Sequence, residues 1–348
     1  MNDATEISLD EFLKLPKGSY LLIDTRNEVS YQLGHIEGAV LPHENIRSAD
    51  NRKLIFYCQY GVQSVETAEQ FRKRGFQAYS LKGGYAAWLK KQFHALDTDE
   101  WERYDRQITL SQIGVTGQLR LKNTAVLIIG AGGLGCPCGM YLAAAGVGRI
   151  GIIDHDEVSL SNMNRQVAHR ETGLNKAVSL KNTLEGINDK IQVTAYPERF
   201  GTDNAAELLD GYDFVIDCTD TAETKFMVND LCVRYDKPYC YGGVIGFEGQ
   251  VMTVIPHKTA CLRCIFEEPP TGCETCESHG IIGAAAGMIG CIQALEAIKY
   301  ITSPDRLLTN QIFIFNMLTM KTRTVGFGGI SSKCSICDRR LSQRTVHH

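Results

Sequence analysis

Short apolar runs separated by polar and glycine-rich segments recur along this chain, and several end at an acidic or reactive residue. The run at residues 125–129 leads into a glycine-rich turn, and the run at 149–154 ends at an aspartate. In the first hundred residues, the run at 54–58 ends at a cysteine. Buried strands followed by turns and helices are typical of α/β folds with a mostly parallel sheet. The pattern therefore predicts an α/β protein.

The longest apolar stretch, residues 280–298, has almost the length of a membrane span. It is rich in glycine and alanine at its start and contains Gln293 and Glu296 further on. A spanning helix needs about 20 predominantly apolar residues without such interruptions. We therefore expect a buried helix of a globular domain, and no membrane partner.

The length and composition of the chain fit two domains. With 348 residues, of which 44% are hydrophobic, it can bury one small and one large core. We predict a first domain at residues 1–95, a linker at 96–103 and a second domain at 104–348. The formal net charge of −4 and the pI near 6.2 indicate no surface for nucleic acid.

The turn after residues 125–129 is a candidate nucleotide site. A strand, a glycine-rich turn and a helix in this order let backbone N–H groups approach phosphate oxygens closely. Asp154 follows near the distance expected for a ribose-binding acid, roughly 20 residues. These features alone also fit an NAD-dependent oxidoreductase. The glycines of the turn are Gly130, Gly132, Gly133 and Gly135.

Three further features favour ATP over a nicotinamide cofactor. A polar cluster at residues 161–166 contains Arg165, Lys176 adds a second cation, and Asp220 follows the next apolar strand. Attack on a phosphorus atom needs cations that offset the phosphate charge and a carboxylate suited to Mg²⁺, whereas hydride transfer needs neither. The sequence therefore favours a site for ATP and Mg²⁺.

Five motifs of the chain, in their order, resemble the MoeB/ThiF family, the bacterial relatives of ubiquitin-activating enzymes. The resemblance runs from about residue 101 to the end of the chain. It implies a Rossmann-like domain that acts as a homodimer and adenylates the C-terminal glycine of a ubiquitin-like sulfur carrier of the ThiS/MoaD type. The motifs lie at residues 104–107, 130–135, 161–166, 217–220 and 283–297.

The resemblance also implies a role for each polar residue of the site. Asp154 would hold the ribose, and Asp220 would coordinate Mg²⁺. Thr221 departs from the family, which usually has asparagine there. A carboxylate is already ionised at neutral pH, so its attack on the α-phosphate needs no general base but does need cations to bring two anions together. The implied cations and donors are Asn162, Arg165, Lys176 and, from the partner subunit, Arg106.

Four segments of the first hundred residues, at 21–26, 34–39, 54–58 and 81–88, resemble a single-domain rhodanese over residues 6–91. Its active loop would run from Cys58 to Ser64, between a buried strand and a helix. Backbone N–H groups and the positive end of the helix dipole lower a thiol's pKa in such a loop and stabilise an anionic persulfide. A buried, inert cysteine is the alternative. The junction position, flanked by Gly61, favours the persulfide.

The rhodanese-like loop departs from its family in charge. Rhodanese loops commonly carry arginine where this chain has Gln63, and often a second basic residue near Gln59. Two neutral amides attract an anion such as thiosulfate less than cations do. We therefore expect Cys58 to accept sulfur from a protein donor such as a cysteine desulfurase. Loss of the rhodanese activity is the alternative.

The 13 cysteines indicate a cytoplasmic chain without a disulfide framework. Their number is odd, and the N-terminus has no basic region followed by an apolar stretch. Three C-x-x-C pairs are present, and one zinc ion takes four thiolates. The resemblance assigns zinc to Cys261, Cys264, Cys334 and Cys337. The remaining pair is Cys273 and Cys276, in a loop where the family's reactive cysteine aligns with Cys276.

The sequence as a whole predicts a small α/β rhodanese domain followed by a Rossmann-like adenylating domain. MgATP would convert the carrier's carboxylate to an acyl-adenylate. Sulfur from Cys58, directly or through Cys276, would then give a thiocarboxylate. An adenylation-deficient sulfur-relay or scaffold protein and an NAD-dependent oxidoreductase are the alternatives. Carriers for thiamin, molybdopterin and other thiolation reactions all fit the sequence.

Overall fold

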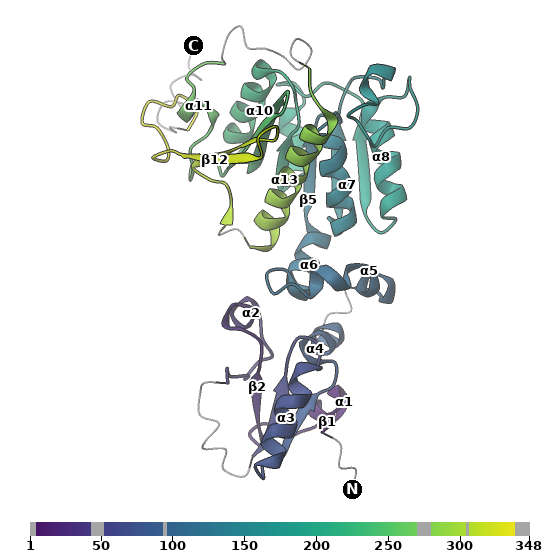
Figure 1. Ribbon diagram of the computed structural model, residues 1–348, viewed down its shortest axis with the longest axis vertical. Helices are drawn as coiled ribbons and strands as arrows, with labels where there is room; N and C mark the ends of the chain where they lie inside the picture. The colour runs from purple at the N-terminus through teal and green to yellow at the C-terminus, as the bar shows by residue number, and fades with distance from the viewer. Residues whose placement is uncertain (1–4, 43–51, 93–95, 270–279, 304–305, 338–348) are drawn as a thin grey trace. The chain divides into compact units, whose positions relative to one another are not determined.

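The chain divides into two compact units, Met1–Leu119 and Arg120–His348 (Figure 1). The computed structural model describes residues 5–42, 52–92, 96–269, 280–303 and 306–337. Helices α5 (Thr98–Ile108) and most of α6 (Gly114–Asn123) belong to the first unit. The domain limits predicted from the sequence, 1–95 and 104–348, stay a prediction. Units defined by packing need not have the same limits as domains defined by family resemblance.

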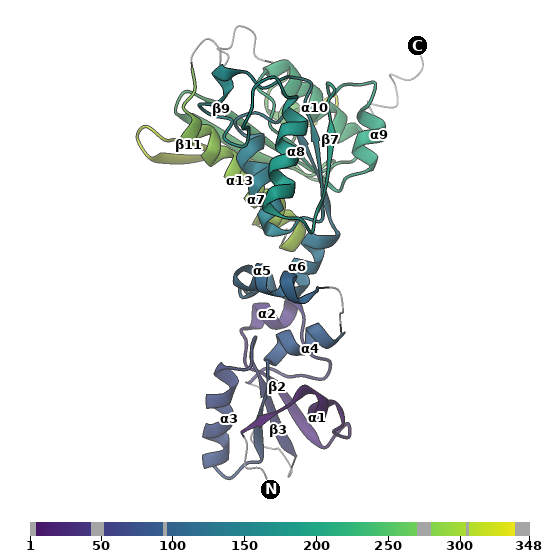
Figure 2. The same ribbon diagram turned by 90° about the vertical axis from the view of Figure 1, so that its right-hand side faces the viewer.

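The first unit contains a four-stranded parallel sheet in the order β1-β4-β3-β2 (Figure 2). Strand β3 (Lys53–Tyr57) lies inside this sheet and is buried from Leu54 onward. Cys58 follows β3 directly, so the strand end determines where the thiol lies. The remaining elements are β1 (Glu6–Ile7), β2 (Tyr20–Asp24), β4 (Ala78–Leu81), α1 (Leu9–Leu13), α2 (Glu28–Leu33), α3 (Gln63–Lys73) and α4 (Gly84–Gln92).

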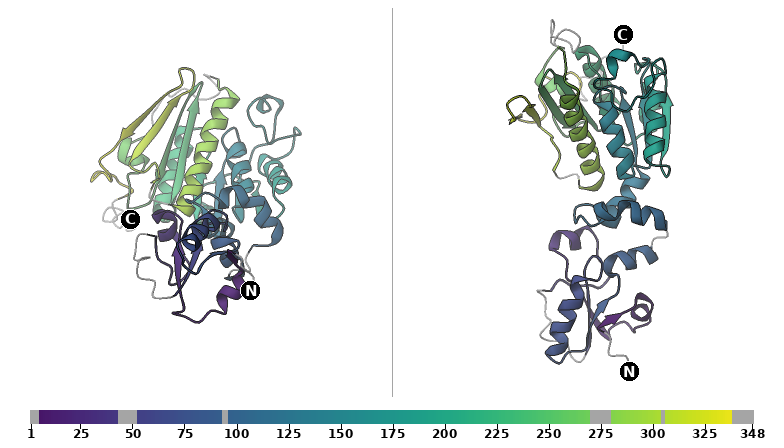
Figure 3. Two further views of the ribbon diagram at one scale, coloured as in Figure 1. Left: turned by 60° about the horizontal axis from the view of Figure 1, so that its bottom comes forward. Right: turned by 45° about the vertical axis from the view of Figure 1, so that its right-hand side comes forward.

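The second unit is built on an eight-stranded sheet in the order β12-β11-β10-β9-β8-β5-β6-β7. The strands from β7 to β9 pair in parallel, and β9 to β12 pair antiparallel. Figure 3 shows this sheet and its helices from two further sides. The strands are β5 (Ala125–Ile129), β6 (Arg149–Ile153), β7 (Gln192–Tyr196), β8 (Phe214–Asp217), β9 (Tyr239–Ile245), β10 (Glu248–Val254), β11 (Gln311–Asn316) and β12 (Lys321–Gly326).

Helices cover both faces of the sheet, which explains the uninterrupted apolar runs in its strands. In β5, Val126 and Ile128 contact one core, whereas Leu127 and Ile129 contact the other. The helices are α7 (Gly135–Ala145), α8 (Lys176–Ile187) and α13 (Gly283–Thr302) at the first core, and α9 (Ala205–Asp210), α10 (Ala222–Arg234) and α11 (Leu262–Ile265) at the second. The predicted α/β fold with a mostly parallel sheet is confirmed.

By length and composition alone, α13 is apolar enough to cross a membrane, and half of its apolar window is buried in the unit. It packs against α7 and β9. Its polar residues are satisfied inside the protein: Gln293 donates to the Asp217 carbonyl at 2.7 Å, and Glu296 accepts from the Thr253 hydroxyl at 2.5 Å. These are features of a core helix, as predicted for residues 280–298.

The direction of the connections changes at β5, which lies between β6 and β8. In open α/β sheets, ligands bind beside the carboxyl ends of the strands at such a switch point. The carboxyl ends of β5, β6 and β8 lead into Gly130, Asp154 and the Asp217–Asp220 turn. The fold therefore brings the predicted nucleotide residues to one edge of the sheet.

Candidate active site

The glycine loop after β5 is too closely packed to accept side chains at two of its positions. Gly130 has φ +98°, and a Cβ there would lie 2.8 Å from the Cys218 carbonyl oxygen. A Cβ on Gly135 would lie 2.0 Å from the Gly130 carbonyl oxygen. The loop thus folds back on itself and against the turn after β8, which exposes its backbone as a cradle for phosphates.

Asp154 is anchored to this loop by its carboxylate. Oδ2 accepts a hydrogen bond from Ala131 N–H at 2.7 Å, and Oδ1 accepts one from Asp156 N–H at 2.9 Å. The side chain is half-buried. The acid therefore lies beside the glycine loop in a fixed orientation, as a ribose-binding acid requires.

The predicted phosphate-binding residues reach the site from two segments. Lys176 begins α8, and its ammonium lies 2.8 Å from Asp156 Oδ2. Arg165 donates to the Ser161 carbonyl at 2.9 Å, and its Cγ lies 3.7 Å from where a Gly133 Cβ would be. Asn162 Oδ1 accepts from Ser159 N–H at 2.9 Å, which stabilises the short 3₁₀ turn η2 (Leu160–Asn162).

The turn after β8 presents Asp220 to solvent, as a Mg²⁺ ligand requires. The next residue, Thr221, caps α10, because its hydroxyl accepts a hydrogen bond from Thr224 N–H at 3.3 Å. Threonine and asparagine both serve as N-caps, so the departure from the family leaves this helix start intact. Arg106 lies on α5 in the other unit with an exposed side chain, and its contact with phosphates stays a prediction.

Two buried residues beside the site, Lys225 and His169, are absent from the sequence-based prediction. Asp217 is fully buried, with its Oδ2 3.5 Å from the ammonium of Lys225, which also donates to the Gly242 carbonyl at 2.5 Å. His169 contacts the Ala131 carbonyl at 2.9 Å and the Ser179 hydroxyl at 3.0 Å, and burial lowers the pKa of its imidazole. Lys225 and His169 lie outside the motifs of the sequence analysis, so the sequence gives no distinctive signal for them.

The Cys58 thiol of the first unit lies in a cradle of hydrogen-bond donors. Burial raises the pKa of this thiol. The Ser64 hydroxyl and the backbone N–H groups of residues 60, 63 and 64 together lower it by more, so the pKa lies below its ordinary value. The Ser64 oxygen is 3.5 Å from the sulfur. Gly61 closes the loop with φ +78°, and a Cβ there would lie 2.7 Å from the Leu81 carbonyl oxygen. The arrangement suits an anionic sulfur.

A cation from the segment at residues 21–26 lies beside this loop. Arg26 donates to Gln59 Oε1 at 3.3 Å and stacks over the Tyr85 ring at 3.8 Å. Its charge is paired with the buried Asp24 at 2.6 Å. Gln63 is exposed at the start of α3. The loop therefore has a charged neighbour, but that charge is already neutralised.

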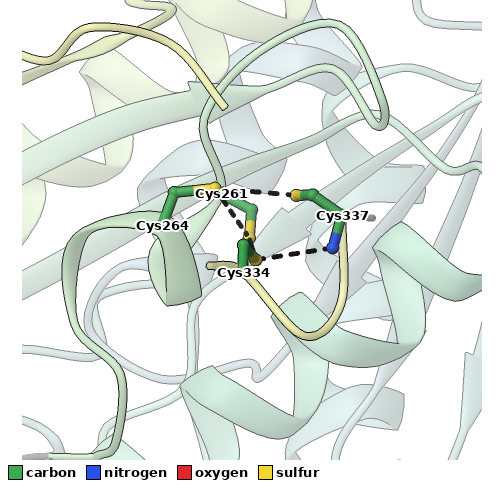
Figure 4. Close-up of side chains that lie close together, drawn as sticks. All are labelled: Cys261, Cys264, Cys334 and Cys337. Carbon is green, nitrogen blue, oxygen red and sulfur yellow. Dashed lines mark hydrogen bonds between the residues drawn. The ribbon is translucent and has the colours of Figure 1, made fainter. Parts of the chain in front are cut away.

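Four cysteines of the second unit converge, although Cys261 and Cys334 lie far apart in the sequence (Figure 4). The Cys261 sulfur lies 3.9 Å from that of Cys264 and 3.7 Å from that of Cys334. Cys264 and Cys337 are 3.7 Å apart. Tetrahedral zinc with Zn–S bonds of about 2.3 Å holds its sulfurs about 3.8 Å apart, so the cluster fits one zinc ion. Cys273 and Cys276 lie outside the described residues.

Two family models match this chain, and they cover the same two regions as the motifs. The model of the ThiF family matches residues 104–336, and the model of the rhodanese-like domain matches residues 8–91.

Among curated proteins, the chain is similar to the adenylyltransferase and sulfurtransferase MOCS3 of Dictyostelium discoideum, with 42% identity over 250 residues. The match covers 70% of this chain and 59% of the relative. The protein of the same name from Culex quinquefasciatus is 44% identical over 260 residues, covering 72% and 59%. The chain therefore spans about three fifths of the length of these relatives.

Solved structures with a similar fold include E. coli MccB with MccA-N7isoASN, with a TM-score of 0.60 and 24% identity. The match covers 72% of this chain and 79% of that one. The structure of E. coli MccB with ATP has a TM-score of 0.60, 23% identity and the same coverage. At these identities the likeness shows the fold.

Proposed function

Because this chain belongs to the ThiF family and carries a rhodanese-like domain before the family match, we propose that it is a sulfur-carrier adenylyltransferase and sulfurtransferase. Its substrate would be the C-terminal glycine of a ubiquitin-like protein. The observation that carries the proposal is the convergence of the glycine loop, Asp154, Arg165 and Lys176 at the switch point of the sheet. The names of the MOCS3 relatives support it.

In the first step, a carboxylate oxygen of the carrier attacks the α-phosphorus of ATP, and pyrophosphate leaves. Asp154 orients the ribose, while Arg165, Asn162 and Lys176 hold the phosphates, and Arg106 of the partner subunit adds a further cation. The cradle at Gly130 and Gly135, which no side chain could enter, fits a nucleotide. Such a step depends on positioning and on charge compensation, which fixed donors supply.

Mg²⁺ fits the same edge of the sheet. Asp220 offers an exposed carboxylate there, and hard oxygen ligands are those that Mg²⁺ prefers. When bound, the ion would offset phosphate charge. Asp220 would hold it, and the buried Asp217 would fix the turn by accepting hydrogen bonds from the N–H and hydroxyl of Thr219 at 3.0 and 2.6 Å.

In the second step, Cys58 carries sulfur as a persulfide received from a protein donor such as a cysteine desulfurase. The terminal sulfur attacks the acyl carbon, AMP leaves, and an acyl disulfide forms. A second thiol, for which Cys276 is the candidate and Cys273 its neighbour, then attacks the Cys58 sulfur. The thiocarboxylate departs, and the two cysteines are left as a disulfide, to be reduced by an external thiol.

We further propose one structural zinc ion per chain, a homodimer and a cytoplasmic location. The sulfur–sulfur distances at Cys261, Cys264, Cys334 and Cys337 support the zinc ion. Four thiolates fill the coordination sphere of a zinc ion and leave no open position for a substrate. The zinc ion would therefore take no part in adenylation.

The test of the adenylation step is ATP–pyrophosphate exchange with a panel of carriers that end in Gly-Gly. Exchange should depend on a cognate carrier and should fall at least about a hundredfold in Arg165→Ala, because an oriented cation is lost at the transition state. Cys58→Ser should exchange at the parent rate. Full exchange in Arg165→Ala or Asp220→Ala would refute these assignments, and NADH binding without ATP binding would favour an oxidoreductase.

A further inference from the structure

Asp156 links the ribose-binding acid to the phosphate-binding lysine. Its backbone N–H donates to Asp154 Oδ1 at 2.9 Å, and its carboxylate oxygen Oδ2 lies 2.8 Å from Lys176 Nζ. Asp154 in turn accepts from Ala131 N–H of the glycine loop at 2.7 Å. A continuous set of hydrogen bonds therefore joins the loop, the ribose acid and the lysine, with Asp156 at its centre.

Lys176 occupies a position that disfavours a cation. It is the first residue of α8, where the helix dipole presents its positive end. It is also only 8% exposed, and a buried charge is costly unless it is paired. Asp156 supplies the opposite charge, and the hydrogen bond with Lys176 lowers the pKa of the Asp156 carboxyl. The acid thus makes the buried ammonium tolerable at this helix start.

The backbone around Asp156 is fixed without help from its side chain. The Asp156 carbonyl accepts from Lys176 N–H at 2.8 Å and from the Asn175 side-chain amide at 3.1 Å. The same amide donates to the Asp154 carbonyl at 3.0 Å. Replacing the Asp156 carboxylate by a carboxamide therefore leaves the frame in place and removes only the charge that faces Lys176.

Metal binding is the alternative role for this acidic segment. Oxygen or nitrogen atoms of Asp154, His155 and Asp156 lie within 4.8 Å of one another. Both Asp154 oxygens, however, already accept backbone N–H groups. The Asp156 oxygens face Lys176 and the His155 ring, and Arg199 lies 3.2 Å from that ring. The positive groups and hydrogen-bond donors around these side chains disfavour binding of a divalent cation. The Asp156 carboxylate therefore acts as the partner of Lys176.

We propose that Asp156 is a positioning residue for ATP binding. It holds the Lys176 ammonium beside Asp154, in the position where the ammonium binds the phosphates. An ammonium has three N–H donors, and one bond to Asp156 leaves two for phosphate oxygens. The inference rests on the proposed function, in which Lys176 contacts the phosphates. Asp156 itself touches neither nucleotide nor carrier in this account.

Binding of ATP and of adenosine to the full chain, measured by calorimetry without a carrier, tests the inference. In Asp156→Asn, ATP should bind about tenfold more weakly, the size of one lost charge-assisted contact, because the ammonium is no longer held. Adenosine has no phosphate, so its affinity should stay within about twofold of the parent. Glu157→Gln, which removes the same charge from the exposed neighbouring side chain, should change neither affinity.

A double-mutant cycle shows whether Asp156 acts through the lysine. In a Lys176→Met background, Asp156→Asn should cause no further loss of ATP affinity. Equal losses for ATP and adenosine, or a full additional loss in that background, would overturn the inference, as would unchanged ATP binding in Asp156→Asn. If the parent chain bound no ATP, the proposed function would fall and this inference with it. Thermal melting of each variant excludes unfolding as the cause.

Discussion

The nucleotide site and the cysteine loop are assembled in different ways. At the nucleotide site, Gly130 packs against the Cys218 carbonyl and Asp154 binds Ala131, so residues far apart in sequence fix one another. At the cysteine loop, most donors to the Cys58 sulfur come from the next six residues. The first site depends on the whole sheet, whereas the second depends mainly on one strand end and one helix start.

The two sites also handle charge differently. Each site pairs one cation with an acid, Lys176 with Asp156 and Arg26 with Asp24. The nucleotide site also has Arg165, which is half-buried and pairs with no carboxylate in the described residues. The proposed ATP site needs available positive charge, whereas a persulfide on Cys58 would be held by backbone dipoles and a hydroxyl. The two sites therefore differ in electrostatics as the two proposed reactions require.

The largest expected effect concerns the long-range assembly of the second unit. Cys334→Ser should abolish stoichiometric zinc and lower the free energy of unfolding of this unit by at least about 3 kcal/mol, because zinc binding contributes folding free energy. Metal analysis and thermal melting measure both. Cys291→Ser, at a half-buried cysteine outside the cluster, should keep its zinc. Undiminished zinc in Cys334→Ser would move the site to other ligands.

Gly135→Ala should disrupt the glycine loop. The added Cβ would lie 2.0 Å from the Gly130 carbonyl oxygen, so the loop must shift. We expect a loss of about 2–3 kcal/mol in stability together with weaker ATP binding, as for other overpacked positions. The matched control is Gly186→Ala in α8, where an added Cβ meets nothing within 4 Å. Denaturant unfolding and calorimetry compare the two, and equal behaviour would argue against a tight cradle.

The pH dependence of the thiol probes the local assembly of the cysteine loop. Because the pKa of Cys58 is lowered in the folded chain, its alkylation by iodoacetamide should reach half its maximal rate below the pH typical of a free cysteine. The stability from the thiolate is fully present above the unfolded pKa and is lost as the pH falls through the folded pKa. Ser64→Ala should move the alkylation midpoint upward. A midpoint that does not move would remove the hydroxyl from the cradle.

The smallest expected effect concerns the choice of sulfur donor. Gln63→Arg adds a cation at the exposed start of α3 and should raise thiosulfate use by about three- to tenfold, as local charge does for an anionic donor. Transfer from a cysteine desulfurase should change little. Gln70→Arg, exposed further along the same helix, is the control. Brisk thiosulfate use in the parent chain, unchanged by Gln63→Arg, would show that loop charge does not select the donor.

The residues in contiguous motifs were accessible to prediction, because their spacing reflects local geometry. The strand before Gly130 and the spacing of the glycines predicted the loop. The four cysteines of the proposed zinc site came from the spacing of two pairs and a family resemblance. Lys225 and His169 were missed, because their partners Asp217 and Ala131 become neighbours only through the fold. Arg26 and Asp24 lie in the segment at residues 21–26, but the contact of Arg26 with Gln59 also depends on the fold. Buried pairing of this kind has no period in the sequence.

The central claim is that the chain activates a carrier's carboxylate at the switch point and sulfurates it with Cys58. Intact-mass spectrometry of a Gly-Gly carrier incubated with MgATP, the Cys58→Ser chain and a sulfur donor tests it most directly. The account predicts a carrier that gains AMP and no sulfur, whereas the parent chain yields the thiocarboxylate and Arg165→Ala yields neither. Thiocarboxylate formed by Cys58→Ser, or an AMP adduct formed by Arg165→Ala at the parent rate, would contradict it.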